Sequence, residues 1–462
     1  MRCLTRLLAP FAAALAAGGA AGCATARPPE QALAVAREDG RRVSFDSATA
    51  DLSVDGVRVI LRPNYATEAV AVNLYLLGGT RQLTAQTQGV EELLLRAGEY
   101  GSAGFPGPRQ REAWGRTGAL LALHAGEDWT LYGFRALRDD FDAAWDVWAD
   151  RLLRPTLAAG DVALARGRLL GRLRQRRTSP DGLAFLVADS VAYAGHPYAL
   201  RPEGSEASLA ALDSAALRAY ADRQLVRSRL LVVVVGHADR AGVEAAVRRT
   251  FARLPGGAYR WTLPAAGPAV AAAEAKRGAV ALVHRPLATN YVLGVFQGPS
   301  AGAPDAPAFR VATALLSGRL TRAVRERSGL SYAAQAPFLE RGATAAVLYV
   351  STAAPARVLE LARAQLDTLR AASYPAFAMR YFTDQFVTDY LAENMTSAAQ
   401  ADFLARAELY QGDYRRGTHA MDALRGLSGY EVRNAAARYL VHPRFVFLGD
   451  TTRVGRGAFA NF

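Results

Sequence analysis

The chain of 462 residues contains almost no cysteine and almost no lysine. Its two cysteines, Cys3 and Cys23, both lie within the first 23 residues. This distribution excludes a disulfide, a cysteine-built metal site and a cysteine nucleophile from the rest of the chain. Of the 55 basic residues only Lys276 is a lysine, and it lies in a proline- and alanine-rich stretch. A serine–lysine mechanism is therefore not expected.

Long hydrophobic runs are also missing from the body of the chain, where none reaches the roughly 20 residues of a membrane-spanning helix. Hydrophobic residues make up 51% of the sequence and charged residues 21%, which is typical of a globular protein and excludes a disordered one. A length of 462 residues indicates more than one domain.

The formal net charge of +13 does not have the pattern of a nucleic-acid-binding protein. Such proteins gather their basic residues in a patch or stripe. Here the arginines are spread along the chain, and only Arg166–Arg177 forms a cluster. No nucleic-acid partner is expected.

The first residues have the features of an export signal. Two arginines in Met1–Arg6 precede the apolar segment Leu7–Ala21, and small residues stand directly before Cys23. This order resembles a bacterial lipobox, which predicts a lipoprotein-type signal peptide over residues 1–22 and lipidation of Cys23. The alternative is ordinary cleavage after Ala26. In both cases the chain is expected on the periplasmic side of a bacterial envelope, and in the first case it is anchored to a membrane through lipid.

Two segments far apart in the sequence begin and end alike, which indicates an internal repeat. Each begins with a β-prone stretch, Arg-Pro, Ala-Thr and a second β-prone stretch: Val57–Thr67 with Ala69–Leu77, and Val280–Thr289 with Tyr291–Phe296. Each also ends with a β-prone run closed by glycine, at Leu230–Gly236 and Phe445–Gly449.

Segments with helical periodicity lie in the sequence between these opening and closing β-prone stretches. They are Phe141–Leu152, Ala158–Arg177, Gly182–Ala194, Ser214–Gln224, Ala306–Ser317, Ala356–Ala371, Ala376–Glu393 and Ser428–Tyr439. Helices enclosed by strands favour an α+β fold over a parallel βαβ series. The predicted organisation is a tether at 23–50, a first α/β-sandwich half at 51–255, a linker at 256–278, a second half at 279–455 and a tail at 456–462.

No familiar catalytic motif is present. No two of the six histidines lie within five residues of each other, so no helical histidine pair is available for a metal. Nucleophile elbows, phosphate loops and dinucleotide fingerprints are absent from the sequence. The most motif-like histidine, His196 in His-Pro-Tyr, is interpreted as part of a turn after a helix.

The order of segments resembles the pitrilysin/insulinase family of zinc peptidases, in the short bacterial form related to mitochondrial processing peptidase. The matching segments are the opening strand Val57–Pro63, Leu77-Gly-Gly-Thr80, Gly89-Val90, His196-Pro-Tyr198, Gly204–Leu209, Val232–Gly236 and, most specifically, Leu316–Tyr332. The resemblance implies two homologous halves, each with a mainly antiparallel sheet covered by helices, that together form a clam-like half-chamber.

The family's zinc motif, His-x-x-Glu-His, maps onto the predicted helix that follows Gly89. The resemblance places Glu92 and Arg96 at the two histidine positions, Leu95 at the general-base position and Arg172 at the more distant glutamate ligand. Leucine accepts no proton, and arginine offers no lone pair to a metal. The family's catalytic role and bound zinc are therefore not expected in this chain. A Glu92–Arg96 ion pair at helical spacing is expected there, and a repurposed binding site is the alternative.

The second half retains a different family feature. In two-chain members, the resemblance implies that the zinc-less chain holds substrate with an arginine and a tyrosine seven residues apart. Arg325 and Tyr332 have this spacing, and Gly329 between them permits a turn from helix to strand. Arg322 and Arg327 are neighbouring alternatives for the arginine.

The resulting hypothesis is a non-catalytic subunit that anchors unfolded peptide for a zinc-bearing partner chain of the same family, with zinc only in that partner. Strand addition at a sheet edge is the expected mode of peptide binding. The alternative is a scaffold or assembly protein with the same fold and no peptidase partner. A hydrolase with an unrecognised site is the least supported interpretation.

Overall fold

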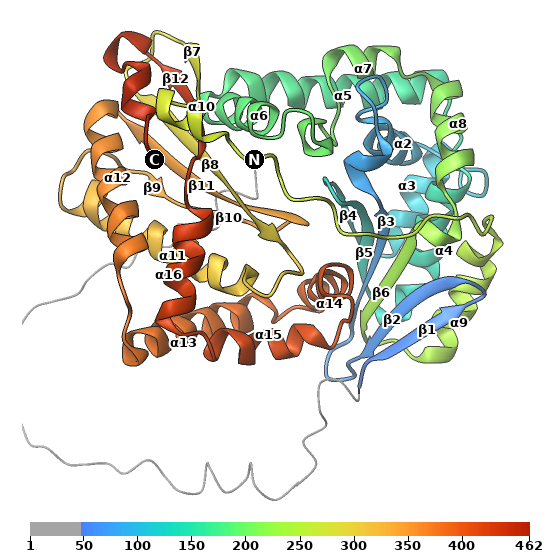
Figure 1. The fold of residues 1–462 in the computed structure, drawn as a ribbon. Helices are drawn as coiled ribbons and strands as arrows, with labels where there is room; N and C mark the ends of the chain where they lie inside the picture. Colours follow the sequence, from blue (N-terminus) through green and yellow to red (C-terminus); the bar gives the residue numbers. More distant parts are fainter. Residues whose placement is uncertain (1–47) are drawn as a thin grey trace, which may run out of the picture. The chain divides into compact units, whose positions relative to one another are not determined.

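Two six-stranded sheets, one from each half of the sequence, form the framework of the protein (Figure 1). The computed structural model describes residues 48–462, apart from the side chains of residues 390–391 and 418–421. The predicted signal peptide and Cys23 therefore lie outside the described residues. None of the described helices combines the length and apolar composition needed to cross a membrane.

The first sheet is antiparallel except for one neighbouring pair, β2 and β6. Its strands run in the order β1 (Ala50–Val54), β2 (Val57–Pro63), β6 (Leu230–Gly236), β3 (Ala69–Leu77), β5 (Trp129–Leu137) and β4 (Leu120–Ala125).

The second sheet is likewise antiparallel except for β7 and β12. Its order is β10 (Phe338–Leu339), β11 (Ala343–Thr352), β8 (Asn290–Ser300), β12 (Arg444–Gly449) and β7 (Val280–His284), and β9 (Ala334–Gln335) also pairs with β11. The mainly antiparallel α/β architecture predicted for both halves is thus confirmed.

The repeat predicted from the sequence has a structural counterpart. In each half the last strand lies between two strands that follow each other in sequence: β6 separates β2 from β3, and β12 separates β7 from β8. A strand at the centre of a sheet is buried on both faces, which explains why β6 is an unbroken run of leucine and valine. β2 and β3, like β7 and β8, are therefore consecutive in sequence without being paired.

The first half contains helices at or near all of its predicted segments and three further helices. They are α2 (Val90–Gly98), α3 (Gly107–Arg116), α4 (Phe141–Leu153), α5 (Ala159–Thr178), α6 (Pro180–Ala192), α7 (Glu206–Ala211), α8 (Ser214–Gln224) and α9 (Arg240–Arg249). Of these, α3, α7 and α9 were not predicted.

The second half contains α10 (Ala272–Arg277), α11 (Ala306–Leu320), a π-helical turn at Thr321–Glu326, α12 (Pro355–Ala371), α13 (Ala376–Glu393), α14 (Ser397–Gln411), α15 (Arg416–Arg425) and α16 (Gly429–Tyr439). No helix was predicted from the sequence at α10, α14 or α15.

Each half covers one sheet face of the other half with a helix. Alternate residues of β6 point to opposite faces; Leu231, Val233 and Val235 pack against Ala401 and Leu404 of α14. In return α6 packs on the second sheet, where Ala184, Ala188 and Ala192 contact Leu293 and Val446. Figure 1 shows α14 beside the first sheet and α6 beside the second. The halves are therefore interlocked.

A buried carboxylate links the same two halves by hydrogen bonds. Asp128, 4% exposed, follows β4. It accepts from the hydroxyls of Tyr198 (2.5 Å) and Tyr410 (2.8 Å) and from the Gly342 amide (2.7 Å). Tyr198 belongs to the first half, whereas Gly342 and Tyr410 belong to the second. One side chain thus joins segments that are more than 200 residues apart.

The predicted linker and tail residues also pack against the halves. Trp261 donates its indole N–H to the Leu409 carbonyl at 2.7 Å and lies against Trp129. After residue 455, Phe459 and Phe462 are buried against Phe445 of β12.

Replacing Asp128 with alanine removes the acceptor for two buried hydroxyls and one buried amide. We expect the free energy of unfolding to fall by about 3 kcal/mol, because each buried donor left without a partner costs roughly 1–3 kcal/mol. Chemical denaturation followed by tryptophan fluorescence measures the loss. Asp139→Ala is the matched control, since its side chain is 84% exposed. Equal stabilities of the two variants would contradict this role for Asp128.

Candidate functional site

The helix that carries the predicted zinc-site positions is α2. Gly89 precedes it with φ of 85°, and a Cβ atom there would lie 2.7 Å from Gly204 Cα, so only glycine fits. Glu91 and Glu92 fall in the first turn, where the helix dipole favours acidic side chains. Leu95 is buried in the core of the first half together with Trp148. The position aligned with the catalytic base is thus a core residue.

The other three aligned residues lie together in an ion-pair cluster. Arg172 of α5 donates to Glu92 Oε1 at 2.7 Å, and Arg96 Nε lies 3.5 Å from the same oxygen. Arg96 also donates to Glu99 at 3.0 Å. Glu92 is only 6% exposed, so its charge is compensated mainly by these two guanidinium groups. The ion pair expected between Glu92 and Arg96 is present, and the contact with Arg172 is the closer of the two.

A second buried carboxylate of α2 was not identified from the sequence. Glu91 accepts from the Thr130 hydroxyl (2.5 Å), the Tyr220 hydroxyl (3.2 Å) and Arg229 Nη2 (3.2 Å). Burial raises the pKa of Tyr220, and the Glu91 carboxylate raises it further, so this phenol stays a neutral donor. Arg229 also donates to the Leu77 carbonyl at 2.7 Å. These partners lie on separate elements, and no local sequence pattern joins them to Glu91.

Arg325 and Tyr332 are brought together by the π-helical turn and the loop that follows it. The chain reverses at Gly329, whose φ is 60°. The Arg325 guanidinium carbon lies 4.6 Å from the centre of the Tyr332 ring, a cation–π distance. Both residues are exposed, Tyr332 to 71%. The remaining guanidinium N–H groups and the phenol are thus accessible to a ligand.

Among the side chains that the structure describes (residues 48–389, 392–417 and 422–462), no group of three or more His, Cys, Asp or Glu is placed to hold a metal ion. His196 begins the short 3₁₀ turn at Pro197–Ala199 after α6, and its Nδ1 accepts from the Tyr198 amide at 3.2 Å. The interpretation of this histidine as a turn residue is confirmed.

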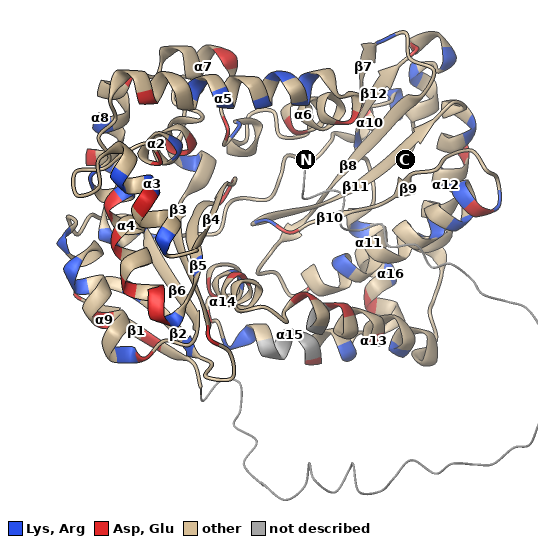
Figure 2. Cartoon of the chain, turned by 180° about the vertical axis from the view of Figure 1, so that it is seen from behind, with Lys and Arg blue, Asp and Glu red and all other residues tan. Residues whose placement is uncertain are grey.

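The arginine cluster of α5 is partly neutralised by neighbouring acids. Arg177 lies 3.1 Å and Arg174 4.0 Å from carboxylate oxygens of Glu206 in α7, and Arg176 pairs with Glu203. Figure 2 shows these basic and acidic segments beside each other and both charge types distributed over the fold.

Replacing Arg172 with alanine would leave the buried Glu92 carboxylate with only the longer contact to Arg96. We expect the free energy of unfolding to fall by about 1–2 kcal/mol, the range for a hydrogen bond to a charged group in a partly exposed setting. Urea denaturation midpoints provide the measurement. Arg174→Ala on the same helix is the control, because its ion pair is long and exposed. A midpoint unchanged by Arg172→Ala would show that the cluster contributes nothing to stability.

Comparisons with known proteins agree on one family. The family model described as the peptidase M16 inactive domain matches residues 211–377. A zinc protease of Mycobacterium bovis is 27% identical over 403 residues, covering 84% of this chain and 90% of the relative. Subunit 1 of the mitochondrial cytochrome b-c1 complex of Bos taurus is 23% identical over 249 residues, 53% of this chain and 50% of that subunit.

A solved structure shares the fold. The crystal structure of a peptidase M16 inactive domain from Pseudomonas fluorescens superposes with a TM-score of 0.77 at 20% identity. The superposition covers 87% of this chain and 98% of that one.

The α2 cluster does not fit the zinc ion that the family resemblance implies. A metal needs several lone-pair donors, and of the four aligned residues only Glu92 offers any; Arg96 and Arg172 would repel a divalent cation. Leu95 has no group that accepts a proton from water. The sequence matches and the shared fold make this chain similar to the M16 peptidase family, and together with the α2 cluster they support an inactive, pitrilysin-like member.

Proposed function

We propose that this chain is the substrate-binding subunit of a two-chain zinc metallopeptidase and anchors unfolded peptide for a zinc-bearing partner of the same family. The observation that carries the proposal is the contrast between the two sites. Glu92 is held by Arg172 at 2.7 Å in a cluster that excludes a metal. Arg325 and Tyr332 are stacked, exposed and open to a ligand.

The exposed pair suits the recognition of peptide backbone. A guanidinium offers several N–H donors in a fixed plane, which match carbonyl oxygens or a carboxylate. Stacking on Tyr332 restricts the Arg325 side chain before a ligand arrives, so less conformational entropy is lost on binding. The tyrosine hydroxyl supplies a further donor.

A sheet edge in the first half supports strand addition. β4 is the terminal strand of its sheet and pairs only with β5. An extended peptide can therefore form backbone hydrogen bonds along its outer side. A cavity of about 160 Å³ at the end of β4 is lined by His124, Glu127, Asp189 and Tyr198, among others, and provides space for a peptide side chain.

The proposed division of roles places zinc in the partner and none in this chain. The partner's metal would supply the activated water that peptide hydrolysis requires. This chain contributes only binding contacts. It therefore has no peptidase activity when purified alone.

A scaffold function is the second candidate, and one finding favours it. The similarity to a cytochrome b-c1 complex subunit extends over about half of this chain. The proposed peptidase subunit and a scaffold differ in the partner they require and in the effect of substitutions at Arg325 and Tyr332.

For the reconstituted pair, we expect Arg325→Ala and Tyr332→Phe to lower peptide turnover. The expected loss is about tenfold or more for Arg325→Ala, because a hydrogen bond to a charged group contributes roughly 1.5–3 kcal/mol. Turnover of a fluorogenic peptide is measured after mixing each variant with the zinc-bearing homologue that co-purifies with the tagged wild-type chain. Size-exclusion chromatography checks that the complex still assembles.

Arg357→Ala is the control, since this exposed arginine lies in α12, outside the turn that carries Arg325. Full turnover by Arg325→Ala would remove the assigned role from that residue. Co-purification with a stable non-peptidase partner, together with no effect of either substitution, would establish the scaffold function instead. Zinc-dependent cleavage by this chain alone would refute both candidates.

We also propose that the mature chain is a lipoprotein anchored through Cys23 on the periplasmic side of the envelope. Cys23→Ala is then expected to move the protein from the membrane fraction to the soluble periplasmic fraction, because the lipid attachment site is lost. Fractionation with immunoblotting measures the distribution. An unchanged soluble distribution of wild type and variant would support cleavage after Ala26.

A further inference from the structure

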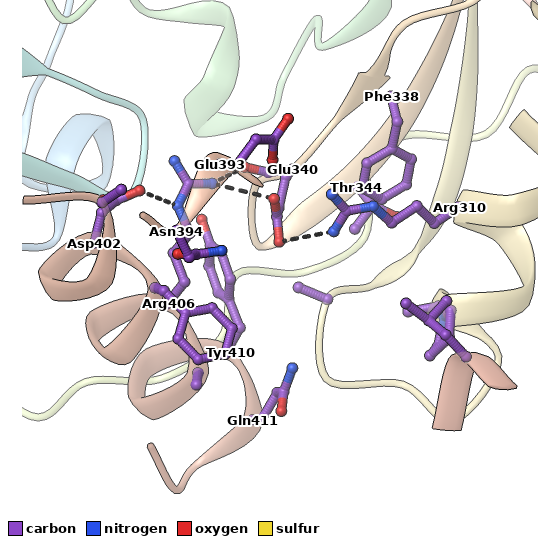
Figure 3. Close-up of a pocket in the computed structure, with 17 residues that line it drawn as sticks. Arg310, Phe338, Glu340, Thr344, Glu393, Asn394, Asp402, Arg406, Tyr410 and Gln411 are labelled. Atoms are coloured by element: carbon purple, nitrogen blue, oxygen red, sulfur yellow. Dashed lines mark hydrogen bonds and ion pairs between the residues drawn. The ribbon is translucent and has the colours of Figure 1, made fainter. Parts of the chain in front are cut away.

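A cavity of about 320 Å³ lies in the second half, separate from the α2 cluster and from the Arg325–Tyr332 pair (Figure 3). One wall is a face of α14, which contributes Asp402, Arg406 and Tyr410. The opposite wall contains Arg310 at the start of α11, and Glu340 after β10. The volume is at the lower end of the range for small-molecule sites.

Two guanidinium groups from opposite walls converge on one carboxylate in this cavity. Arg310 Nη1 lies 3.4 Å from Glu340 Oε1, and Arg406 Nη1 lies 3.5 Å from Glu340 Oε2. Arg406 is held in position by Asp402 at 2.6 Å, and the Tyr75 hydroxyl in turn donates to Asp402 at 3.4 Å. Figure 3 shows Glu340 between the two arginines.

The contacts of Glu340 are those of a replaceable anion. Both of its ion pairs are long, and the Glu340 and Arg310 side chains are each 39% exposed. Ion pairs of this kind contribute little to stability, so breaking them costs little. The arginines, in contrast, are fixed by Asp402 and by the Phe338 ring, which lies 5.6 Å from the Arg310 guanidinium carbon. A carboxylate ligand can therefore take the place of Glu340 and bind both guanidinium groups.

The rest of the lining is mostly apolar. It consists of Ala301, Ala306, Pro307, Phe338, Ala399, Phe403, Ala407 and Leu424, with Thr344, Asn394 and Gln411 as neutral polar residues. Glu393 also lines the cavity and disfavours an anion, whereas the charge of Asp402 is compensated by Arg406. The two converging arginines and the apolar walls together specify an acidic head group attached to an apolar body.

We propose that this cavity binds an amphipathic carboxylate, with the head group at Arg310 and Arg406 and the apolar part against Phe338 and Phe403. Two sources offer this chemistry: a free medium-chain fatty acid, and the C-terminal residue of an apolar peptide. The site does not depend on the proposed peptidase partnership, because all its residues belong to this chain.

Binding is tested on the wild-type chain with decanoate and with N-acetyl-Phe-Leu, each titrated by calorimetry. Tryptophan fluorescence gives an independent signal, because the Trp129 ring lies 5.0 Å from the Tyr410 ring of the cavity. Decanol and N-acetyl-Phe-leucinamide are the neutral controls, and decylamine is the cationic one. We expect at least one acid to saturate the site and its neutral counterpart to bind at least tenfold more weakly.

Saturation by decanoate alone identifies a fatty-acid site, and saturation by the dipeptide alone identifies a peptide C-terminus. Glu340→Gln should tighten binding several-fold by removing the competing carboxylate, and Arg310→Ala should weaken it about tenfold. Arg357→Ala, an exposed arginine of α12, is the control and should bind as wild type. The proposal is overturned if neither acid saturates, if neutral or cationic analogues bind as well, or if Glu340→Gln and Arg310→Ala both leave affinity unchanged.

Discussion

The Asp128 carboxylate is the interaction on which the arrangement of the two halves depends. A charged group buried at a junction is tolerated only when it is hydrogen-bonded, and here three donors from three segments satisfy it. Tyr410 belongs to α14, the helix that covers the first sheet, so the same hydrogen bond fixes the position of that helix. Apolar packing of α6 and α14 on the two sheets accompanies these hydrogen bonds.

The chemical role of helix α2 depends on the partners of its two acidic residues. Glu91 is bound to Arg229 and Tyr220 inside the fold, and Glu92 is bound to Arg172 near the surface. Both carboxylates are therefore occupied by donors from the same chain. Helix α2 is thus part of the core of the first half, while Arg325 and Tyr332 of the second half are exposed.

Many of the strands and helices were predictable because local sequence patterns indicate them. The valine run of β6 indicated a strand, and the repeated Arg-Pro and Ala-Thr sequences indicated two related halves. The Glu92–Arg96 pair followed from helical spacing alone. The covering role of α14, the donors of Asp128 and the partner of Glu91 were not predictable. Each joins residues far apart in sequence, and their pairing depends on tertiary packing that no local pattern encodes.

The exchange of α6 and α14 between the halves has a consequence for biosynthesis. When β6 leaves the ribosome, the face of the first sheet that carries Leu231, Val233 and Val235 has no cover, because α14 is translated much later. The nascent chain therefore exposes this apolar face of the first sheet until nearly all of the polypeptide has been synthesised. Folding of this face can be completed only after α14 has been synthesised, and a holdase chaperone that shields the surface until then would raise the yield of native protein.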